Sequence, residues 1–264
     1  MKKRLISLCM VLVLCLSLLP VAVLAAGNSY VALGDSITTG YGLEGEQSFA
    51  EIVADKNGYD LNILAEDGAT SGDLLGVVTD QANAETLKNA DLITITIGGN
   101  DLMGALYQFL ADKYNETNEP DISAQDVQDA LAGKEGTTNL QSALIVVATS
   151  VIGDFAESDA ATAALTTFGK NLASIITAIK TVNPDVTIIV ANQYNPYAYA
   201  FSSFLPAIVE AFKEGVKALN TAIQTGATLY GYEVADAYTS FEKAEKNPCN
   251  ASFAPMNLDF HPNA

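Results

Sequence analysis

Three residues spread along the first hundred positions of this chain carry groups suited to acyl transfer. They are Ser36, Gly68 and Asn100, and each stands among small and acidic residues. A serine hydroxyl becomes a nucleophile when a neighbouring base takes its proton. The tetrahedral intermediate then needs hydrogen-bond donors aimed at its oxyanion. We expect the backbone N–H groups of Ser36 and Gly68 and the side-chain amide of Asn100 to supply an oxyanion hole.

The base of such a site can be identified by counting. His261 is the only histidine of the chain, so a Ser–His hydrolase built from it has no other imidazole. Asp259 precedes it by two residues and can hold the imidazole tautomer by accepting a hydrogen bond from Nδ1–H. We therefore expect Ser36 as nucleophile, His261 as general base and Asp259 as the residue that orients the base.

These residues need a scaffold that brings them together, and the hydrophobic pattern predicts a parallel α/β sheet. Short β-rich runs alternate with longer helical stretches, and most of the runs are apolar on both faces. The predicted strands are Ser29–Leu33, Leu61–Leu64, Leu92–Ile97, Val186–Val190 and Tyr232–Ala235. The predicted helices are Phe49–Lys56, Ser71–Lys88, Phe168–Thr181 and Leu205–Gly226.

Right-handed crossovers between such strands make a three-layer α/β/α sandwich with a five-stranded parallel sheet. The carboxyl ends of the strands form the binding crevice where the strand order reverses. If the first strand lies between the second and the third, Ser36, Gly68 and Asn100 converge on one spot.

Two further stretches complete the expected domain, which spans residues 27–264. Residues 103–167 exceed a simple crossover, and we expect a helical insertion beside the active-site face, whose apolar run Ala143–Ile152 is suited to line a substrate groove. After the last predicted strand, no helical pattern of the length that normally covers such a strand follows. We therefore expect the C-terminal helix to be missing.

The first 26 residues have the pattern of a secretory signal peptide. Lys2, Lys3 and Arg4 precede an apolar run, Leu5–Leu24, and small residues follow at the cleavage position. We therefore expect a secreted protein without stable membrane insertion after cleavage, although an uncleaved anchor has a similar pattern. Cleavage would move the formal net charge from −18 to −21. Such a surface repels nucleic acid, so we exclude it as a partner.

The motifs around these residues resemble those of the GDSL or SGNH hydrolase family. The first block is matched by Gly34-Asp35-Ser36-Ile37-Thr38 and the second by Gly68. The third is matched by Gly98-Gly99-Asn100-Asp101, and the last by Asp259-Phe260-His261-Pro262-Asn263. The resemblance implies a flavodoxin-like sandwich and hydrolysis of esters or thioesters without a cofactor or metal. It also implies the roles given above to Ser36, Gly68, Asn100 and His261.

One position departs from the commonest family pattern. That pattern has Asp three residues before the histidine, where this chain has Leu258, and Asp259 is two residues before it. Some members of the family share the shorter spacing, and others orient the histidine with a backbone carbonyl. Both arrangements therefore remain open for this chain.

The function predicted from these features is hydrolysis of carboxylic esters, of acyl or lysophospholipid type, through an acyl-enzyme on Ser36. A carbohydrate O-acetyl esterase is an alternative, with Tyr194, Tyr197 and Tyr199 as an aromatic platform for sugar. An acyltransferase that uses the same intermediate is another. A non-catalytic binding protein is the alternative that the complete residue set disfavours.

Overall fold

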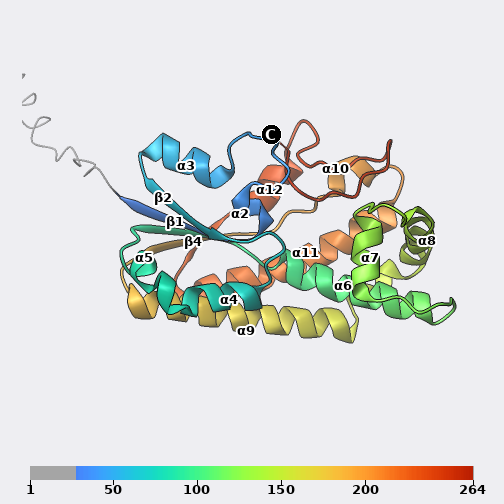
Figure 1. Ribbon diagram of the computed structural model, residues 1–264, viewed down its shortest axis with the longest axis horizontal. Coiled ribbons are helices and arrows are strands. Elements are labelled where there is room, and N and C mark those ends of the chain that lie inside the picture. The colour runs from blue at the N-terminus through green and yellow to red at the C-terminus, as the bar shows by residue number, and fades with distance from the viewer. Residues whose placement is uncertain (1–27, 264) are drawn as a thin grey trace, which may run out of the picture.

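The sheet of this protein is parallel throughout, as the sequence pattern predicts. The computed structural model describes residues 28–263, so the predicted signal peptide at 1–26 lies outside the described residues. Its five strands have the order β2-β1-β3-β4-β5 (Figure 1). They are β1 (Ser29–Gly34), β2 (Asp60–Ala65), β3 (Leu92–Thr96), β4 (Thr187–Ala191) and β5 (Glu233–Ala235). The predicted place of the first strand between the second and the third is confirmed.

Strand register brings the three catalytic segments to one edge. Gly34, the last residue of β1, is level with Ala65 at the end of β2 and with Thr96 at the end of β3. The loops that follow these strands therefore leave the sheet at the same height. The strands β1 and β3 are almost fully buried, which explains why their sequences are apolar on both faces.

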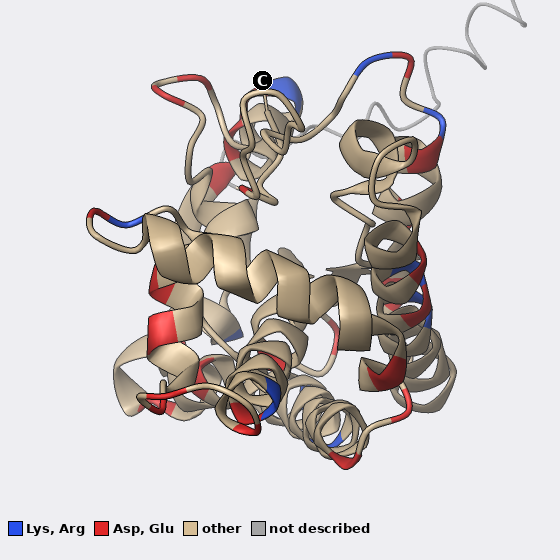
Figure 2. Cartoon of the chain, turned by 90° about the vertical axis from the view of Figure 1, so that its right-hand side faces the viewer, with Lys and Arg blue, Asp and Glu red and all other residues tan. Residues whose placement is uncertain are grey.

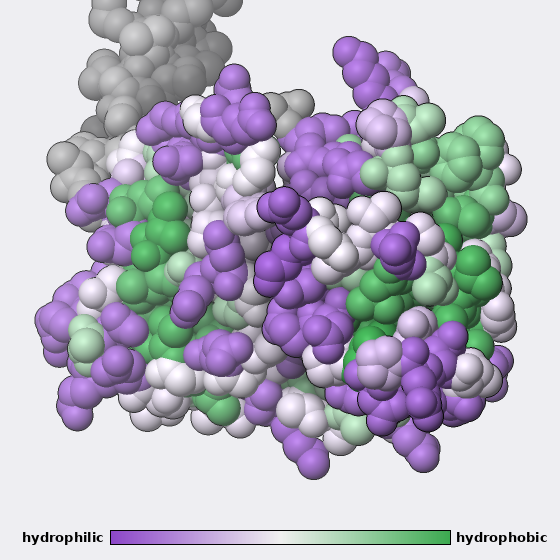
Figure 3. All heavy atoms as spheres, turned by 45° about the vertical axis from the view of Figure 1, so that its right-hand side comes forward, coloured by the Kyte–Doolittle hydropathy of each residue, from purple (hydrophilic) through white to green (hydrophobic). Residues whose placement is uncertain are grey.

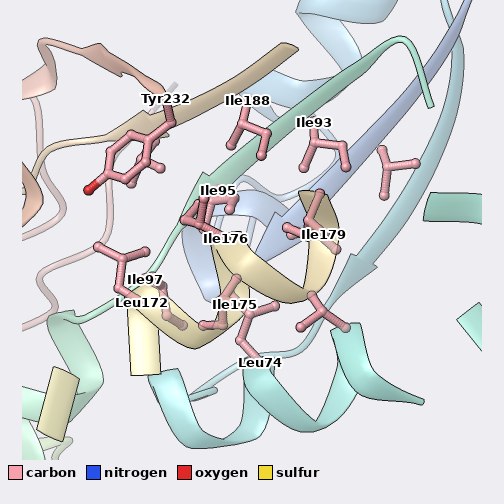
Figure 4. Packing of buried hydrophobic residues seen from close by; sticks show 14 of the residues in the cluster. Leu74, Ile93, Ile95, Ile97, Leu172, Ile175, Ile176, Ile179, Ile188 and Tyr232 are labelled. Atoms are coloured by element: carbon pink, nitrogen blue, oxygen red, sulfur yellow. The ribbon is translucent and has the colours of Figure 1, made fainter. Parts of the chain in front are cut away.

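Helices cover both faces of the sheet (Figure 1). One face packs on α4 (Ser71–Thr79), α9 (Asp159–Val182) and α11 (Pro206–Tyr230). Figure 4 shows this core, in which isoleucines of β3 and α9 interdigitate with Leu74 and Tyr232. The other face packs on α3 (Phe49–Asn57), whose Ala50 and Ala54 lie against Tyr30 of β1.

A second core lies at the end of the molecule where the insertion was expected. It joins α6 (Gly99–Asn115), α7 (Ala124–Leu131) and α8 (Thr138–Phe155). The predicted helices are present, and the two outer ones extend beyond residues 103 and 167. The helix α6 begins directly after the β3 loop, and α9 begins at Asp159 because Ser158 caps its N-terminus by accepting from the Ala161 N–H. The insertion is thus built partly on extensions of two crossover helices.

Two local predictions need a similar correction. The stretch predicted as one helix from residue 71 to 88 is α4, a 3₁₀ turn at Gln81–Asn83 and α5 (Ala84–Lys88), because Asp80 caps the turn and interrupts the helix. The stretch after β5, where no covering helix was expected, begins with the short helix α12 (Ala237–Glu242). Two short helices, α2 (Ser36–Thr39) and α10 (Ala198–Phe201), complete the fold.

A buried polar network fixes the turn between β1 and α2. Asp35 is 3% exposed, and its carboxylate accepts hydrogen bonds from the Thr96 hydroxyl at 2.8 Å and from the Ile37 N–H at 3.1 Å. The hydroxyl of Thr38 lies 2.8 Å from that of Thr96. Burial raises the pKa of Asp35 to about 6, although these hydrogen bonds oppose the shift.

The raised pKa of Asp35 predicts a pH-dependent contribution to stability. Native Asp35 keeps its proton up to about pH 6, whereas an unfolded carboxyl releases it near 3.8. Between these values the native state binds more protons, so the unfolding free energy falls as pH rises. The substitution Asp35→Asn should remove this fall, which amounts to about 3 kcal/mol for a shift of this size. Urea unfolding at pH 4 to 8 measures it.

The exposed carboxyl of Asp185 provides the control, since Asp185→Asn removes only a solvated charge. The wild type and the Asp185→Asn protein, which both keep Asp35, should then show the same change of unfolding free energy with pH. An Asp35→Asn protein that follows the same curve would contradict the assignment of this buried charge.

The close approach of the turn after β3 to α9 predicts that a side chain at Gly98 destabilises the fold. Its φ is +106°, and a Cβ there would lie 2.6 Å from the Phe168 ring. The substitution Gly98→Ala should lower the unfolding free energy by about 1–3 kcal/mol. Gly76, an exposed helical glycine with open space at its Cβ position, is the control. There Gly76→Ala should raise stability by about 0.5–1 kcal/mol, and equal losses in the two variants would contradict the packing argument.

Candidate active site

Ser36 occupies the first position of α2, directly after the capping residue Asp35. Asp35 accepts a hydrogen bond from the Ile37 N–H, so the chain turns sharply out of β1 and presents Ser36 at the carboxyl edge of the sheet. The serine is 5% exposed. Its Oγ lies 2.9 Å from Nε2 of His261, a residue 225 positions further along the chain.

A carboxylate holds the other ring nitrogen of His261. Nδ1 lies 2.6 Å from Oδ1 of Asp259, and the backbone N–H of His261 donates to the same oxygen at 3.1 Å. Burial alone would raise the pKa of Asp259, but these hydrogen bonds together with one from Asn250 lower it below the usual range. Asp259 therefore stays ionised at neutral pH and can accept the Nδ1 proton. The sequence left open whether Asp259 or a backbone carbonyl orients the histidine. In the structure the Asp259 carboxylate lies at Nδ1.

Gly68, on the loop after β2, and Asn100, in the first turn of α6, line the same cavity as Ser36. Gly68 has a φ of +79°, a left-handed conformation that the glycine adopts without strain. Asn100 uses one amide hydrogen on the Ala69 carbonyl at 2.9 Å, which leaves the second for a ligand. Ser36, Gly68, Asn100 and His261 line one cavity. The structure thus brings Ser36, Gly68, Asn100, Asp259 and His261 to one cavity.

Hydrogen bonds among Asp101, Ser71 and Asn171, which sequence reasoning missed, lie behind this site. Asp101 accepts two hydrogen bonds from Ser71, from its N–H at 2.8 Å and from its hydroxyl at 2.5 Å. Asn171 of α9 donates to the same Ser71 hydroxyl at 3.0 Å. The loop that carries Gly68 and the helix that carries Asn100 are therefore tied to each other and to α9. Only the presence of Asp101 next to Asn100 pointed to this contact.

Two of the three tyrosines considered for the alternative sugar platform hold the C-terminal tail in place. The hydroxyl of Tyr194 donates to the Phe260 carbonyl at 3.0 Å, and that of Tyr197 donates to the Leu258 carbonyl at 2.9 Å. Burial raises the pKa of both phenols, so both remain donors. Only Tyr199 of the three is exposed, so the predicted aromatic platform is wrong.

The cavity in front of Ser36 has a volume of about 730 Å³. One wall carries the polar residues of the site. The other walls are mostly apolar side chains of α6, α7, α8 and α11, among them Leu106, Leu110, Leu131, Ile145, Ile152, Ile208 and Phe212. A smaller hollow of about 70 Å³ adjoins it, and Ser36 and Asn100 line both. Within residues 28–263 no cluster of His, Cys, Asp or Glu is arranged to hold a metal ion.

By sequence, this chain matches one protein family and parts of two bacterial proteins. The model of the GDSL-like lipase/acylhydrolase family matches residues 32–264. The spore germination lipase LipC of Bacillus licheniformis is 35% identical over 91 residues, which are 32% of this chain and 43% of LipC. The YpmR protein of Bacillus subtilis is 33% identical over 100 residues, which are 34% of this chain and 39% of YpmR. These matches thus span less than half the length of either relative.

Solved structures share the fold at low sequence identity. The lipase Lip_vut3 from a goat rumen metagenome has a TM-score of 0.57 at 20% identity, over 89% of this chain and 90% of its own. Phospholipase A1 from Streptomyces albidoflavus has a TM-score of 0.56 at 20% identity, over 90% of this chain and 92% of its own. The family match runs from β1 to the tail that bears His261, and we conclude that this chain belongs to the GDSL-like lipase/acylhydrolase family.

Proposed function

We propose that this protein hydrolyses carboxylic esters of lipid type through an acyl-enzyme on Ser36. One observation carries the proposal. The hydrogen-bonded row Ser36–His261–Asp259 faces a cavity whose walls are mostly apolar. Family membership supports a hydrolase of the lipase and esterase kind, and the geometry supports these three residues as its catalytic groups.

In the first half of the proposed reaction, Ser36 Oγ attacks the ester carbonyl carbon while its proton passes to His261 Nε2. The carbonyl π electrons move onto oxygen, and the N–H groups of Ser36 and Gly68 and the free amide hydrogen of Asn100 stabilise that oxyanion. When the intermediate collapses, the bond to the alcohol oxygen breaks. His261 gives its proton to that oxygen, and the alcohol leaves.

In the second half, water takes the place of the alcohol. His261 accepts a proton from the water as its oxygen attacks the acyl carbon, and the same donors stabilise the second oxyanion. Collapse breaks the bond to Ser36 Oγ and releases the carboxylic acid as His261 returns the proton. The ionised carboxylate of Asp259 stabilises the imidazolium that forms in each half.

The cavity supports an acyl chain as part of the substrate. Burial of each methylene group contributes about 0.8 kcal/mol, so an apolar wall favours longer chains. We also propose that the protein acts outside the cell, because Lys2, Lys3 and Arg4 precede the apolar run of residues 5–24.

The catalytic proposal predicts the effect of Ser36→Ala on p-nitrophenyl esters. Loss of the nucleophile should lower kcat/KM by at least about 10⁴-fold and abolish labelling by a fluorophosphonate probe. The exposed serine Ser174 is the control, and Ser174→Ala should retain both. Equal turnover in the two variants would sink the proposed function, and a folded wild-type protein that resists the probe would favour a non-catalytic binding protein.

The cavity predicts how chain-length preference can be changed. Gly104 of α6 lines the cavity, and open space surrounds its Cβ position. Gly104→Leu should therefore fill part of the cavity without strain and lower the ratio of octanoate to acetate kcat/KM by about tenfold. Gly76→Leu, on an exposed helix face, is the matched control and should keep the wild-type ratio. A ratio unchanged in both would place the acyl chain outside this cavity.

A further inference from the structure

The helix α8 lies on the surface but is almost without charge. Its 18 residues include one ionisable side chain, Asp154, in a chain that has 13 Lys and Arg and 31 Asp and Glu. By length and composition it is apolar enough to cross a membrane, yet only 22% of it is buried. Figure 2 shows it running across the end of the molecule, with acidic residues near its far end and little charge along its length.

The two sides of α8 have different surroundings. Its inner side packs into the helical core through buried residues such as Leu144 and Phe155, while Ile145 and Ile152 line the cavity. This packing makes α8 part of the domain and not a separate membrane span. On its outer side Val146 is 66% exposed. One helix therefore borders both the cavity and the solvent.

Three of the four hydroxyl groups on α8 donate to carbonyls of the same helix. Ser142 donates to the Thr138 carbonyl at 3.0 Å, and Thr149 and Ser150 donate to the Val146 carbonyl at 2.8 and 2.9 Å. These donors would not be left unpaired if the helix lay against an apolar phase. The outer side can therefore lose contact with water at little cost.

Met256 and an aromatic pair beside Leu205 add apolar surface at or next to residues that line the same cavity. Met256 lines it and is 39% exposed. Phe204 is 59% exposed and stacks on Phe253 with ring centroids 4.0 Å apart, next to Leu205, which lines the cavity. We name Val146, Phe204, Phe253 and Met256 the apolar rim. Figure 3 brings this end of the molecule forward, and hydrophobic patches lie on it between polar ones.

Charge decides what kind of surface the apolar rim fits. The chain carries a formal net charge of −18, which repels anionic lipid. The lysines on either side of α7 are already paired, Lys113 with Glu116 at 2.6 Å and Lys134 with Asp129 at 2.5 Å. A surface of zwitterionic phospholipid presents no net charge and accepts apolar side chains at its boundary.

We infer that α8 and the apolar rim dock on a zwitterionic phospholipid surface, so that the cavity opens toward the acyl esters held there. The inference rests on the proposed function, because it says that the Ser36 site takes its ester substrate from a phospholipid surface. It requires no movement of α8, since this helix already borders both the cavity and the solvent.

Flotation with phosphatidylcholine vesicles tests this inference. The protein carries Ser36→Ala so that no lipid is consumed, and it should float with the vesicles. Adding Val146→Glu should weaken binding by about tenfold or more. Leu229→Glu is the matched control, because Leu229 is 68% exposed on α11 outside the apolar rim, and it should bind like the parent. For the parent protein, replacing half of the phosphatidylcholine by phosphatidylglycerol should also weaken binding to the vesicles. Far-UV circular dichroism checks that each variant is folded.

The active protein gives a second measurement. Val146→Glu should lower the ratio of activity on vesicle-bound long-chain ester to activity on dissolved p-nitrophenyl butyrate, and Leu229→Glu should not. The inference fails if the parent does not float, if it floats only with phosphatidylglycerol, or if both glutamate variants bind equally. It also fails if sedimentation velocity shows a dimer that Val146→Glu dissociates while no vesicle binding occurs. Each of these results leaves Ser36-dependent hydrolysis of dissolved esters intact, whereas loss of that dependence would overturn the proposed function separately.

Discussion

The placement of His261 beside Ser36 is the constraint that the other contacts around this site must satisfy. One hydrogen bond of 2.9 Å joins residues 225 positions apart. Such a bond contributes about 1 kcal/mol, whereas fixing the backbone of each tail residue costs about 1–2 kcal/mol. The bond therefore cannot hold the tail by itself. Other contacts must place the tail at the carboxyl edge of the sheet, and the bond then forms as their consequence.

Those contacts are mainly hydrogen bonds to the backbone of the tail. Buried hydroxyls of Tyr194 and Tyr197 donate to tail carbonyls, and the Asn263 amide donates to the carbonyls of Asn247 and Cys249 at 2.9 Å. In the part of the chain that the structure describes, every buried side-chain nitrogen and oxygen has a partner. Displacing the tail would leave two buried phenols without acceptors, which is costly in an apolar setting. This penalty gives the position of His261 its specificity.

The sequence predicted the sheet and the site residues because both depend on local signals. Apolar runs mark the strands, and the rule of right-handed crossovers limits the order in which they pair. A single histidine left one choice of base. The supporting contacts were not predictable in this way. Ser71 and Asn171 meet although 100 residues separate them, and a tyrosine followed by a loop looks the same whether it binds sugar or a tail carbonyl.

The turn that carries Ser36 also shows where the fold departs from local rules. Gly34 and Gly98 both have positive φ, and Asp35 is a carboxyl buried at a raised pKa. A side chain at Gly34 would collide with Thr96, the same residue whose hydroxyl binds Asp35. These departures coincide at the edge where β1 and β3 end, and few occur along the strands themselves. Positive φ also occurs in other turns, but only here do two such glycines and a buried carboxyl meet, at the place where a serine must leave the sheet at a fixed angle to meet a histidine from the far end of the chain.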